Sequence, residues 1–203
     1  MLQSLEPDAI KAALLPLAIS DGADQVQREG QRGASVLMPL VMRSEWHVIL
    51  TQRPETMPSH AGQISFPGGK REVGETAQEA ALRETYEEVG LPSERIKLLG
   101  RLRSFNAVGE YRVTPFVGVI DSDAVIKPDA REVADTFEVP LSFLMDANNH
   151  VPRDVHFDEK MHRLWDMPYQ DADGVERNIW GMTAMMIYRF YQRLVLGVYD
   201  EDF

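Results

Sequence analysis

Residues 68–91 read GGKREVGETAQEAALRETYEEVGL, and the stretch contains the signals of one complete helix. Thr76 followed three residues later by Glu79 fits a capping box, in which each residue bonds the other's backbone N–H. Gly90 fits the left-handed position just past a helix C-terminus. We therefore predict a helix within residues 76–90.

The glutamates of this helix do not share one face. At about 100° per residue, Glu84, Glu87 and Glu88 fall within an arc of roughly 100°, whereas Glu79 points about 140° away from Glu84. Like charges at these spacings cost a helix roughly 0.2–0.5 kcal/mol per pair, and acids also oppose the dipole at a C-terminal end. Two interpretations stay open here: a site for a hard divalent cation such as Mg²⁺, or a solvated acidic face.

The size of the neighbouring side chains predicts how the helix packs. Three small residues share the side of the carboxylates and leave room beside them: Ala77, Ala80 and Ala81. Three bulkier residues lie on the other side, where we expect the core: Leu82, Tyr86 and Val89.

Composition restricts the partners that the chain can have. The 203 residues include 21 Lys and Arg against 32 Asp and Glu, which gives a formal net charge of -11. This balance argues against nucleic acid and anionic membranes, because binding to either depends on Lys and Arg. A phosphorylated small molecule remains possible if a metal ion offsets the repulsion.

The absence of cysteine excludes disulfides, thiolate catalysis and cysteine-based zinc sites. The apolar run near the N-terminus lacks a preceding basic region, and no run approaches the roughly 18 apolar residues that span a bilayer. We therefore expect a cytoplasmic protein with no membrane partner.

The pattern of apolar segments predicts one α+β domain over residues 1–203, with a helical extension at about 1–30. Pro39 suggests that its strand is an edge strand or contains a bulge. The expected elements are a short helix in 7–18, a hairpin of strands 34–42 and 46–52, a shaped loop at 56–69, strands at 95–105 and 111–120, a strand leading into a helix at 136–146, a hairpin of strands 163–169 and 175–180, and a final helix at 181–197.

The helix and the loop before it resemble a known family. Gly69, Glu75 and the run from Arg83 to Leu91 match the Nudix box, GX5EX7REUXEEXGU, at every fixed position. Thr85 departs from the bulky aliphatic residue that the pattern prefers, which affects packing and not chemistry. The resemblance implies hydrolysis of a diphosphate linked to another moiety with Mg²⁺ or Mn²⁺, an α/β/α sandwich around a mixed β-sheet, and a homodimer, which is frequent among relatives.

The resemblance also assigns roles to the box residues. Glu84, Glu87 and Glu88 are expected to hold the metal ions, with the backbone of Gly69 nearby. Arg83 is expected to pair with Glu75 and to brace the helix against the preceding loop. A water would then attack one phosphorus of the diphosphate.

A second resemblance narrows the substrate. Residues 50–69, LTQRPETMPSHAGQISFPGG, are similar to the signature that precedes the box in coenzyme A pyrophosphatases, and the likeness extends over roughly residues 34–195. Pro54 and Pro58 depart from that signature, where it has Ser or Ala and Arg. We expect cleavage of coenzyme A or its thioesters into 4′-phosphopantetheine products and adenosine 3′,5′-bisphosphate. The alternatives are hydrolysis of ADP-ribose or a dinucleotide, and a noncatalytic Nudix domain that senses a nucleotide.

Several residues outside the helix are candidates for contact with the substrate. The candidate binding residues are Arg53, His60, Lys70 and Arg71. Each also has a simpler interpretation as a surface residue or, for His60, as an organiser of its loop. Glu132 is a candidate general base or further metal ligand from a loop outside the box.

Overall fold

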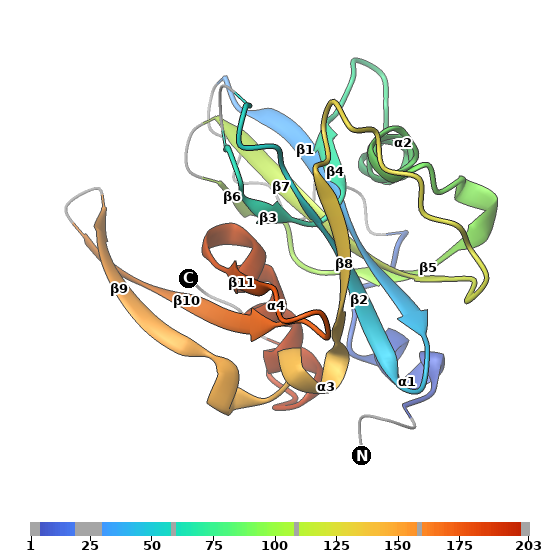
Figure 1. Ribbon diagram of the computed structural model, residues 1–203. Helices are drawn as coiled ribbons and strands as arrows, with labels where there is room; N and C mark the ends of the chain where they lie inside the picture. Colours follow the sequence, from blue (N-terminus) through green and yellow to red (C-terminus); the bar gives the residue numbers. More distant parts are fainter. Residues whose placement is uncertain (1–4, 19–29, 58–59, 108–109, 158–159, 200–203) are drawn as a thin grey trace.

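A computed structural model describes residues 5–18, 30–57, 60–107, 110–157 and 160–199 (Figure 1). Eight strands form one mixed sheet, whose main path runs β3-β2-β1-β7-β5, with β4 on β1, β6 on β7 and β8 on β2. Their bounds are β1 Arg32–Met42, β2 Trp46–Gln52, β3 Ile64–Ser65, β4 Gly68–Lys70, β5 Ile96–Arg101, β6 Phe105–Asn106, β7 Tyr111–Ile120 and β8 Asp135–Pro140.

Strand β1 is the centre of this sheet. It pairs in parallel with β7 from Arg32 opposite Tyr111 to Val41 opposite Ile120, and antiparallel with β4 and then β2 on its other side. The hairpin of β1 and β2 is confirmed, but the prediction that Pro39 marks an edge or bulge was wrong. The pairing with β4 covers residues 34–36 and that with β2 covers 40–42, so the proline falls where β1 passes from one partner to the other.

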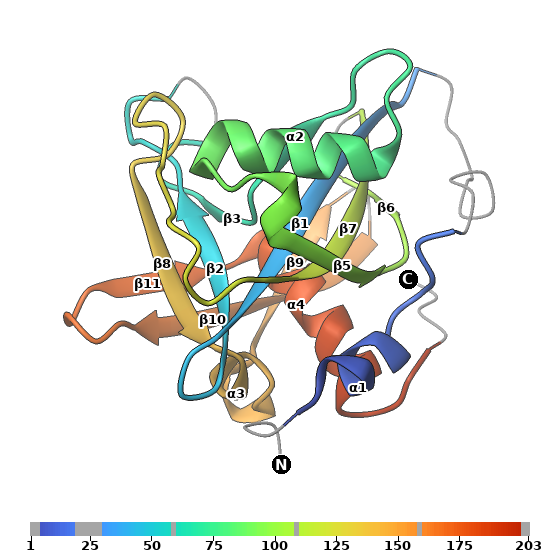
Figure 2. The ribbon, with the colours of Figure 1, turned by 90° about the vertical axis from the view of Figure 1, so that its right-hand side faces the viewer.

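Helices cover both faces of the sheet, which confirms the expected α/β/α sandwich (Figure 2). Helix α2, Ala77–Val89, lies on one face. Helix α4, Gly181–Leu194, and the short α1, Pro7–Ala12, lie on the other. The chain ends are joined there, because Nε of Arg193 donates to the carbonyl of Ala13 at 2.6 Å. The rest of the expected N-terminal extension lies largely outside the described residues.

A second sheet of three strands extends from the body (Figure 1). Its strands, in the order β11-β10-β9, are β9 Val151–Phe157, β10 Lys160–Gln170 and β11 Glu176–Ile179. A short helix α3, Leu141–Leu144, follows β8 as expected. The predicted hairpin of β10 and β11 is confirmed, and β9 is an additional strand. In the described part of the chain, no helix is long and apolar enough to cross a membrane.

The side of α2 that faces the sheet carries small side chains. Ala77 and Ala81 are buried in one cluster with Leu37 of β1 and Phe116 of β7. Alanines let a helix approach a sheet closely, so the small residues meet the core instead of opening space beside the carboxylates. The packing predicted for these alanines was therefore wrong.

The bulkier residues of α2 do not form the opposite, core-facing side that we predicted. Only Val89 is buried, in a separate cluster with Val41 and Ile49. Leu82 is half-buried, and Tyr86 is 58% exposed.

This packing predicts opposite outcomes for two substitutions. Ala81→Leu is expected to lower the free energy of unfolding by about 1–3 kcal/mol, because a larger side chain cannot fit between α2 and the sheet. Tyr86→Ala is expected to change it by less than about 0.5 kcal/mol, as is usual for surface positions. Urea denaturation measures both. A larger loss in Tyr86→Ala than in Ala81→Leu would contradict the observed face.

Candidate active site

The helix that carries the glutamates is capped as its sequence predicts. The Thr76 hydroxyl accepts the Glu79 N–H at 3.2 Å, and the Glu79 carboxylate accepts the Thr76 N–H at 2.8 Å. Gly90 follows the last turn with φ of 66°, the left-handed conformation that glycine adopts without strain. Thr85 is buried and donates to the Ala81 carbonyl, so the departure from the box pattern is accommodated inside the helix.

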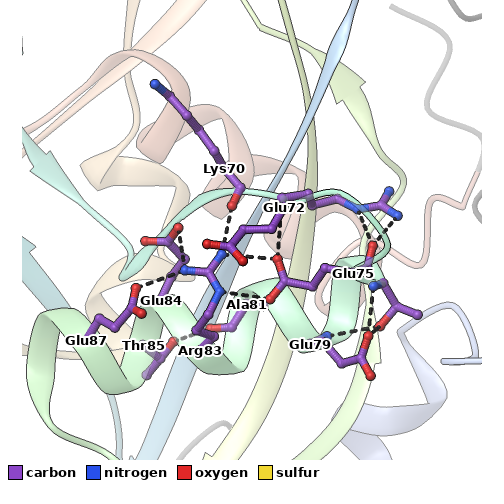
Figure 3. Close-up of polar contacts among 11 residues, drawn as sticks. Lys70, Glu72, Glu75, Glu79, Ala81, Arg83, Glu84, Thr85 and Glu87 are labelled. Carbon is purple, nitrogen blue, oxygen red and sulfur yellow. Dashed lines mark hydrogen bonds and ion pairs between the residues drawn. The ribbon is translucent and has the colours of Figure 1, made fainter.

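Arg83 is the centre of the polar contacts on this helix (Figure 3). Its guanidinium binds both oxygens of Glu75, with Nε and Nη2 at 2.8 and 3.1 Å. Nη1 donates to Glu84 at 3.0 Å and to Glu87 at 2.8 Å. Nη2 also donates to the carbonyl of Lys70 at 2.9 Å. The expected pairing with Glu75 is present, and the same guanidinium holds two of the converging glutamates.

The pKa values of Glu75 and Glu84 are shifted in opposite directions. The hydrogen bonds from Arg83 lower the pKa of Glu75, and Glu75 in turn raises that of Arg83. Burial raises the pKa of Glu84, and the nearby charge of Glu87 adds to the effect that Arg83 opposes. Glu75 is therefore a fixed anion, whereas Glu84 is an anion that the fold holds against a desolvation cost.

Glu88 is the most buried of the converging glutamates, at 4% exposure. One carboxylate oxygen accepts the Gly68 N–H at 3.1 Å, and the other lies 3.9 Å from Nη1 of Arg53. Burial raises its pKa to about 7, a change that these two contacts only partly oppose. A buried carboxylate with so little compensation is a group that a cation would stabilise.

Two glycines allow the preceding loop to approach this helix. Gly69 lies so close to Glu84 that a Cβ at this position would be 2.5 Å from the carboxyl carbon. Gly68 has φ of 153°, and a Cβ there would lie 2.4 Å from the Ser35 carbonyl oxygen. The role of Gly68 as a donor to Glu88 was not predicted, although its position directly before Gly69, the first residue of the box, was a usable signal.

The donor set fits a divalent cation in its chemistry. Glu84, Glu87 and Glu88 supply the hard oxygen ligands that Mg²⁺ and Mn²⁺ take, and the missing side chain of Gly69 lets the loop backbone lie against the Glu84 carboxyl. Across the parts of the chain that the structure describes, no three His, Asp or Glu side chains are gathered closely enough to hold a metal ion. Glu84 and Glu87 instead each give an oxygen to Arg83, which neutralises part of their charge.

The four predicted substrate-binding residues occupy different surroundings. Arg53 lies beside Glu88, at the end of β2. His60 is exposed, with φ of 57°, and its Nδ1 lies 2.8 Å from Oε1 of Gln63, which supports a loop-organising contact. The Lys70 ammonium lies 5.7 Å from the centre of the Tyr111 ring on an exposed strand end. Arg71 donates to the Glu75 carbonyl at 2.9 Å and so helps to shape the loop.

Glu132 lies near the same acids. Its loop is fixed to the end of α2, because the N–H groups of Lys127 and Asp129 donate to the carbonyls of Val89 and Glu88 at 2.8 and 2.9 Å. The charge of Glu132 contributes to the raised pKa of Glu88 and also acts on Glu84. The loop therefore brings a carboxylate from outside the box close to the cluster.

The sequence is similar to those of a known family of proteins. Residues 31–165 match the family model of the NUDIX domain. The chain is 37% identical over 166 residues to "Uncharacterized Nudix hydrolase NudL" of Escherichia coli (strain K12), covering 80% of this chain and 84% of that protein. The protein of the same name from Photorhabdus laumondii is 36% identical over 167 residues, covering 82% and 87%.

Solved structures share the fold at low sequence identity. A MutT/nudix family protein from Enterococcus faecalis has a TM-score of 0.57 at 17% identity, covering 84% of this chain and 64% of that chain. The DR0079 protein of Deinococcus radiodurans has a TM-score of 0.53 at 16% identity, covering 82% and 86%.

The sandwich is thus that of the Nudix fold. The chain belongs to the Nudix hydrolase family and is a pyrophosphohydrolase. Enzymes of this family act on small nucleoside diphosphate derivatives and use divalent metal ions.

The burial of Glu88 predicts how the stability of the metal-free protein depends on pH. The folded state favours the protonated carboxyl, so stability from this group is greatest below its unfolded pKa of 4.5 and falls until the pH reaches about 7. Glu88→Gln keeps an acceptor for Gly68 and removes the charge. In EDTA at pH 8 we expect this variant to exceed the wild type by on the order of 2 kcal/mol, and by much less at pH 4.5.

Denaturation with EDTA present at pH 4.5, 6 and 8 measures this difference. Glu72→Gln removes the same charge from an exposed position on the neighbouring loop and is the control, with little expected change. A Glu88→Gln protein that is less stable than the wild type at pH 8 would show that the ionised carboxylate stabilises the fold.

Proposed function

We propose that the substrate is coenzyme A or one of its thioesters, and that the diphosphate is cleaved to 4′-phosphopantetheine products and adenosine 3′,5′-bisphosphate. The observation that carries the proposal is the position of residues 50–69, the stretch that resembles the coenzyme A pyrophosphatase signature. This stretch meets the acid helix at both ends, through Arg53 and through Gly68, and both contact Glu88. A substrate diphosphate bound at the glutamates would therefore lie beside the signature residues.

The proposed mechanism assigns the divalent ion, Mg²⁺ or Mn²⁺, to Glu84, Glu87 and Glu88. When bound, the ion neutralises the diphosphate and activates a water. Arg83, oriented by Glu75, holds Glu84 and Glu87 in place through its hydrogen bonds. We propose that Glu132 receives the proton of the attacking water. The new P–O bond forms at one phosphorus while its bond to the bridging oxygen breaks, and the leaving phosphate takes the bridging oxygen.

The cations around the cluster are proposed to orient the anionic substrate. Arg53 is close enough to Glu88 to contact a phosphate held there. Lys70 and His60 are exposed and accessible to a substrate that enters from solvent. Arg71 is proposed as a weaker contact, because its guanidinium already binds the carbonyl of Glu75.

One observation favours a second candidate substrate. Pro54 follows Arg53 where the coenzyme A signature has Ser or Ala, and Pro58, which replaces an expected Arg, lies outside the described residues. Without that Arg, the enzyme would have less reason to prefer coenzyme A over ADP-ribose or a dinucleotide. A noncatalytic sensor is not supported, because the chain keeps all three glutamates of the box.

A homodimer and a cytoplasmic location remain proposals. The Met- and aromatic-rich helix α4 packs into the core of its own chain, with Met186, Ile187 and Phe190 at most 3% exposed. Its composition is therefore explained without a partner subunit.

A substrate panel tests the proposed specificity. With Mg²⁺ or Mn²⁺ we expect kcat/KM for coenzyme A to exceed that for ADP-ribose by about tenfold or more, a difference of about 1.4 kcal/mol in transition-state binding. Dephospho-coenzyme A reports whether the 3′-phosphate contributes. A clear preference for ADP-ribose would overturn the coenzyme A proposal and leave the hydrolase assignment intact.

Removal of a ligand or of the metal tests the site. Glu88→Gln is expected to lower kcat by about 100-fold or more, since loss of a carboxylate lowers the affinity for the metal ion. EDTA is expected to stop turnover of the wild type until Mg²⁺ or Mn²⁺ is restored. Glu72→Gln serves again as the control that keeps activity. Wild-type turnover by folded Glu88→Gln would show that the metal ligands are assigned wrongly.

A further inference from the structure

One buried cation connects the two sheets behind the site. Arg177 lies in β11 and is 8% exposed. Nη1 donates to Oε1 of Gln52, the last residue of β2, at 2.5 Å, and Nη2 donates to Oδ2 of Asp135, the first residue of β8, at 2.5 Å. The guanidinium also lies 4.3 Å from the centre of the Phe137 ring and 3.3 Å from Asp171. One side chain thus fixes the ends of two strands of the large sheet to the small sheet.

Gln52 is also hydrogen-bonded to the loops around the site. Its carbonyl accepts the N–H of Ala134 at 2.8 Å, and its side-chain amide lies 3.5 Å from the Gly62 carbonyl. The next residue, Arg53, donates its N–H to the Gln63 carbonyl at 3.0 Å. The residue that Arg177 holds is therefore bonded to both the loop before the Nudix box and the loop after β7.

Both loops carry groups that act on the cluster. Arg53 lies 3.9 Å from Glu88, and Glu132 stands two residues before Ala134 and three before Asp135. A shift of the β2 and β8 ends would move Arg53 relative to α2, which is anchored through Arg83 and Glu75. The same shift would pull on Glu132 from the Asp135 side, while the other end of its loop stays bonded to the end of α2. Displacements of about 1 Å at a reacting centre can cost about 100-fold in rate.

Packing alone is a weak explanation for this arginine. Burying a guanidinium carries a desolvation cost that an apolar side chain would avoid, and buried ion pairs are often replaced by hydrophobic residues without loss of stability. Gln52 and Asp135 are paired in the β2–β8 ladder, and an apolar residue could not bond their side chains to β11, whereas the planar fork of arginine sets the direction of both bonds.

We propose that Arg177 is a positioning residue for the Nudix reaction, which holds Arg53 and Glu132 in register with the acid helix through Gln52 and Asp135. The inference rests on the active site proposed above, but it does not depend on coenzyme A as the substrate.

Steady-state kinetics on Arg177→Met, Gln52→Ala and the double variant test the proposal. With coenzyme A and Mg²⁺, at a temperature where circular dichroism shows each protein folded, we expect kcat/KM to fall about 10- to 100-fold in Arg177→Met. We also expect kcat/KM to fall in Gln52→Ala. The double variant should fall much less than the product of the two single effects, because both substitutions break one connection.

The matched control is Arg163→Met. Arg163 makes a two-bond contact with Asp154 inside the hairpin of β9 and β10, at 2.8 and 3.1 Å. Its replacement removes a similar two-bond pair that lies within the β9–β10 hairpin, and it is expected to change kcat/KM by less than about twofold.

Hydrogen exchange gives a readout that does not need turnover. We expect the amides of Ala134 and Arg53 to exchange faster in Arg177→Met while those of α2 stay as protected as in the wild type. If the wild type does not cleave coenzyme A, that substrate proposal fails, and Arg177 is judged by exchange and by turnover of ADP-ribose. Wild-type kcat/KM in folded Arg177→Met, or an equal loss of protection throughout α2, would overturn the positioning role.

Discussion

The site depends on the hydrogen bonds that the guanidinium of Arg83 makes with the glutamates around it. Of the six glutamates on α2 and on the loop before it, four lie around Arg83 and the glycine loop, and without a cation among them they would repel one another. Arg83 bonds three of them, Glu75, Glu84 and Glu87, and also the backbone of Lys70. The same group therefore joins loop to helix and holds two acids side by side.

The fourth carboxylate, Glu88, has different neighbours. It is buried against the glycine loop with one N–H donor and a distant arginine, so its charge is poorly compensated in the metal-free protein. The fold thus concentrates electrostatic cost at Glu88, while Arg83 offsets part of that cost at Glu84. Sites that bind a hard cation commonly combine such groups, because the ion then adds its stabilisation where it is most needed.

Features that depend on neighbours along the chain were predictable from sequence. The capping box of Thr76 and Glu79 and the left-handed Gly90 depend on residues a few positions apart. The pairing of Glu75 with Arg83 was expected from the resemblance to the Nudix box. The Nudix box also indicated the sandwich, because its pattern belongs to one fold. The binding roles of Arg53, His60, Lys70 and Arg71 stay predictions.

Features that depend on the sheet were not predictable in the same way. Ala81 faces the core because Leu37 and Phe116 lie beneath it, and nothing within the helix sequence shows how close the sheet will come. Strand β9 contains Pro152 and has no buried side chain from Val151 to His156, so its sequence lacks the apolar residues that usually indicate a strand. The bond of Arg177 to Gln52 joins positions 125 residues apart.

The central place of β1 has a consequence for how the chain assembles during synthesis. This strand is made early, yet its longest pairing is with β7, which begins at Tyr111, and the face it shares with α4 is completed only when residues 181–194 have been made. The pair of Arg193 with Ala13 closes the molecule across 180 positions. Such long-range pairings slow folding. The β7 edge of this apolar strand would stay unpaired until residue 120 has been made, and the face that α4 covers would stay open until residue 194.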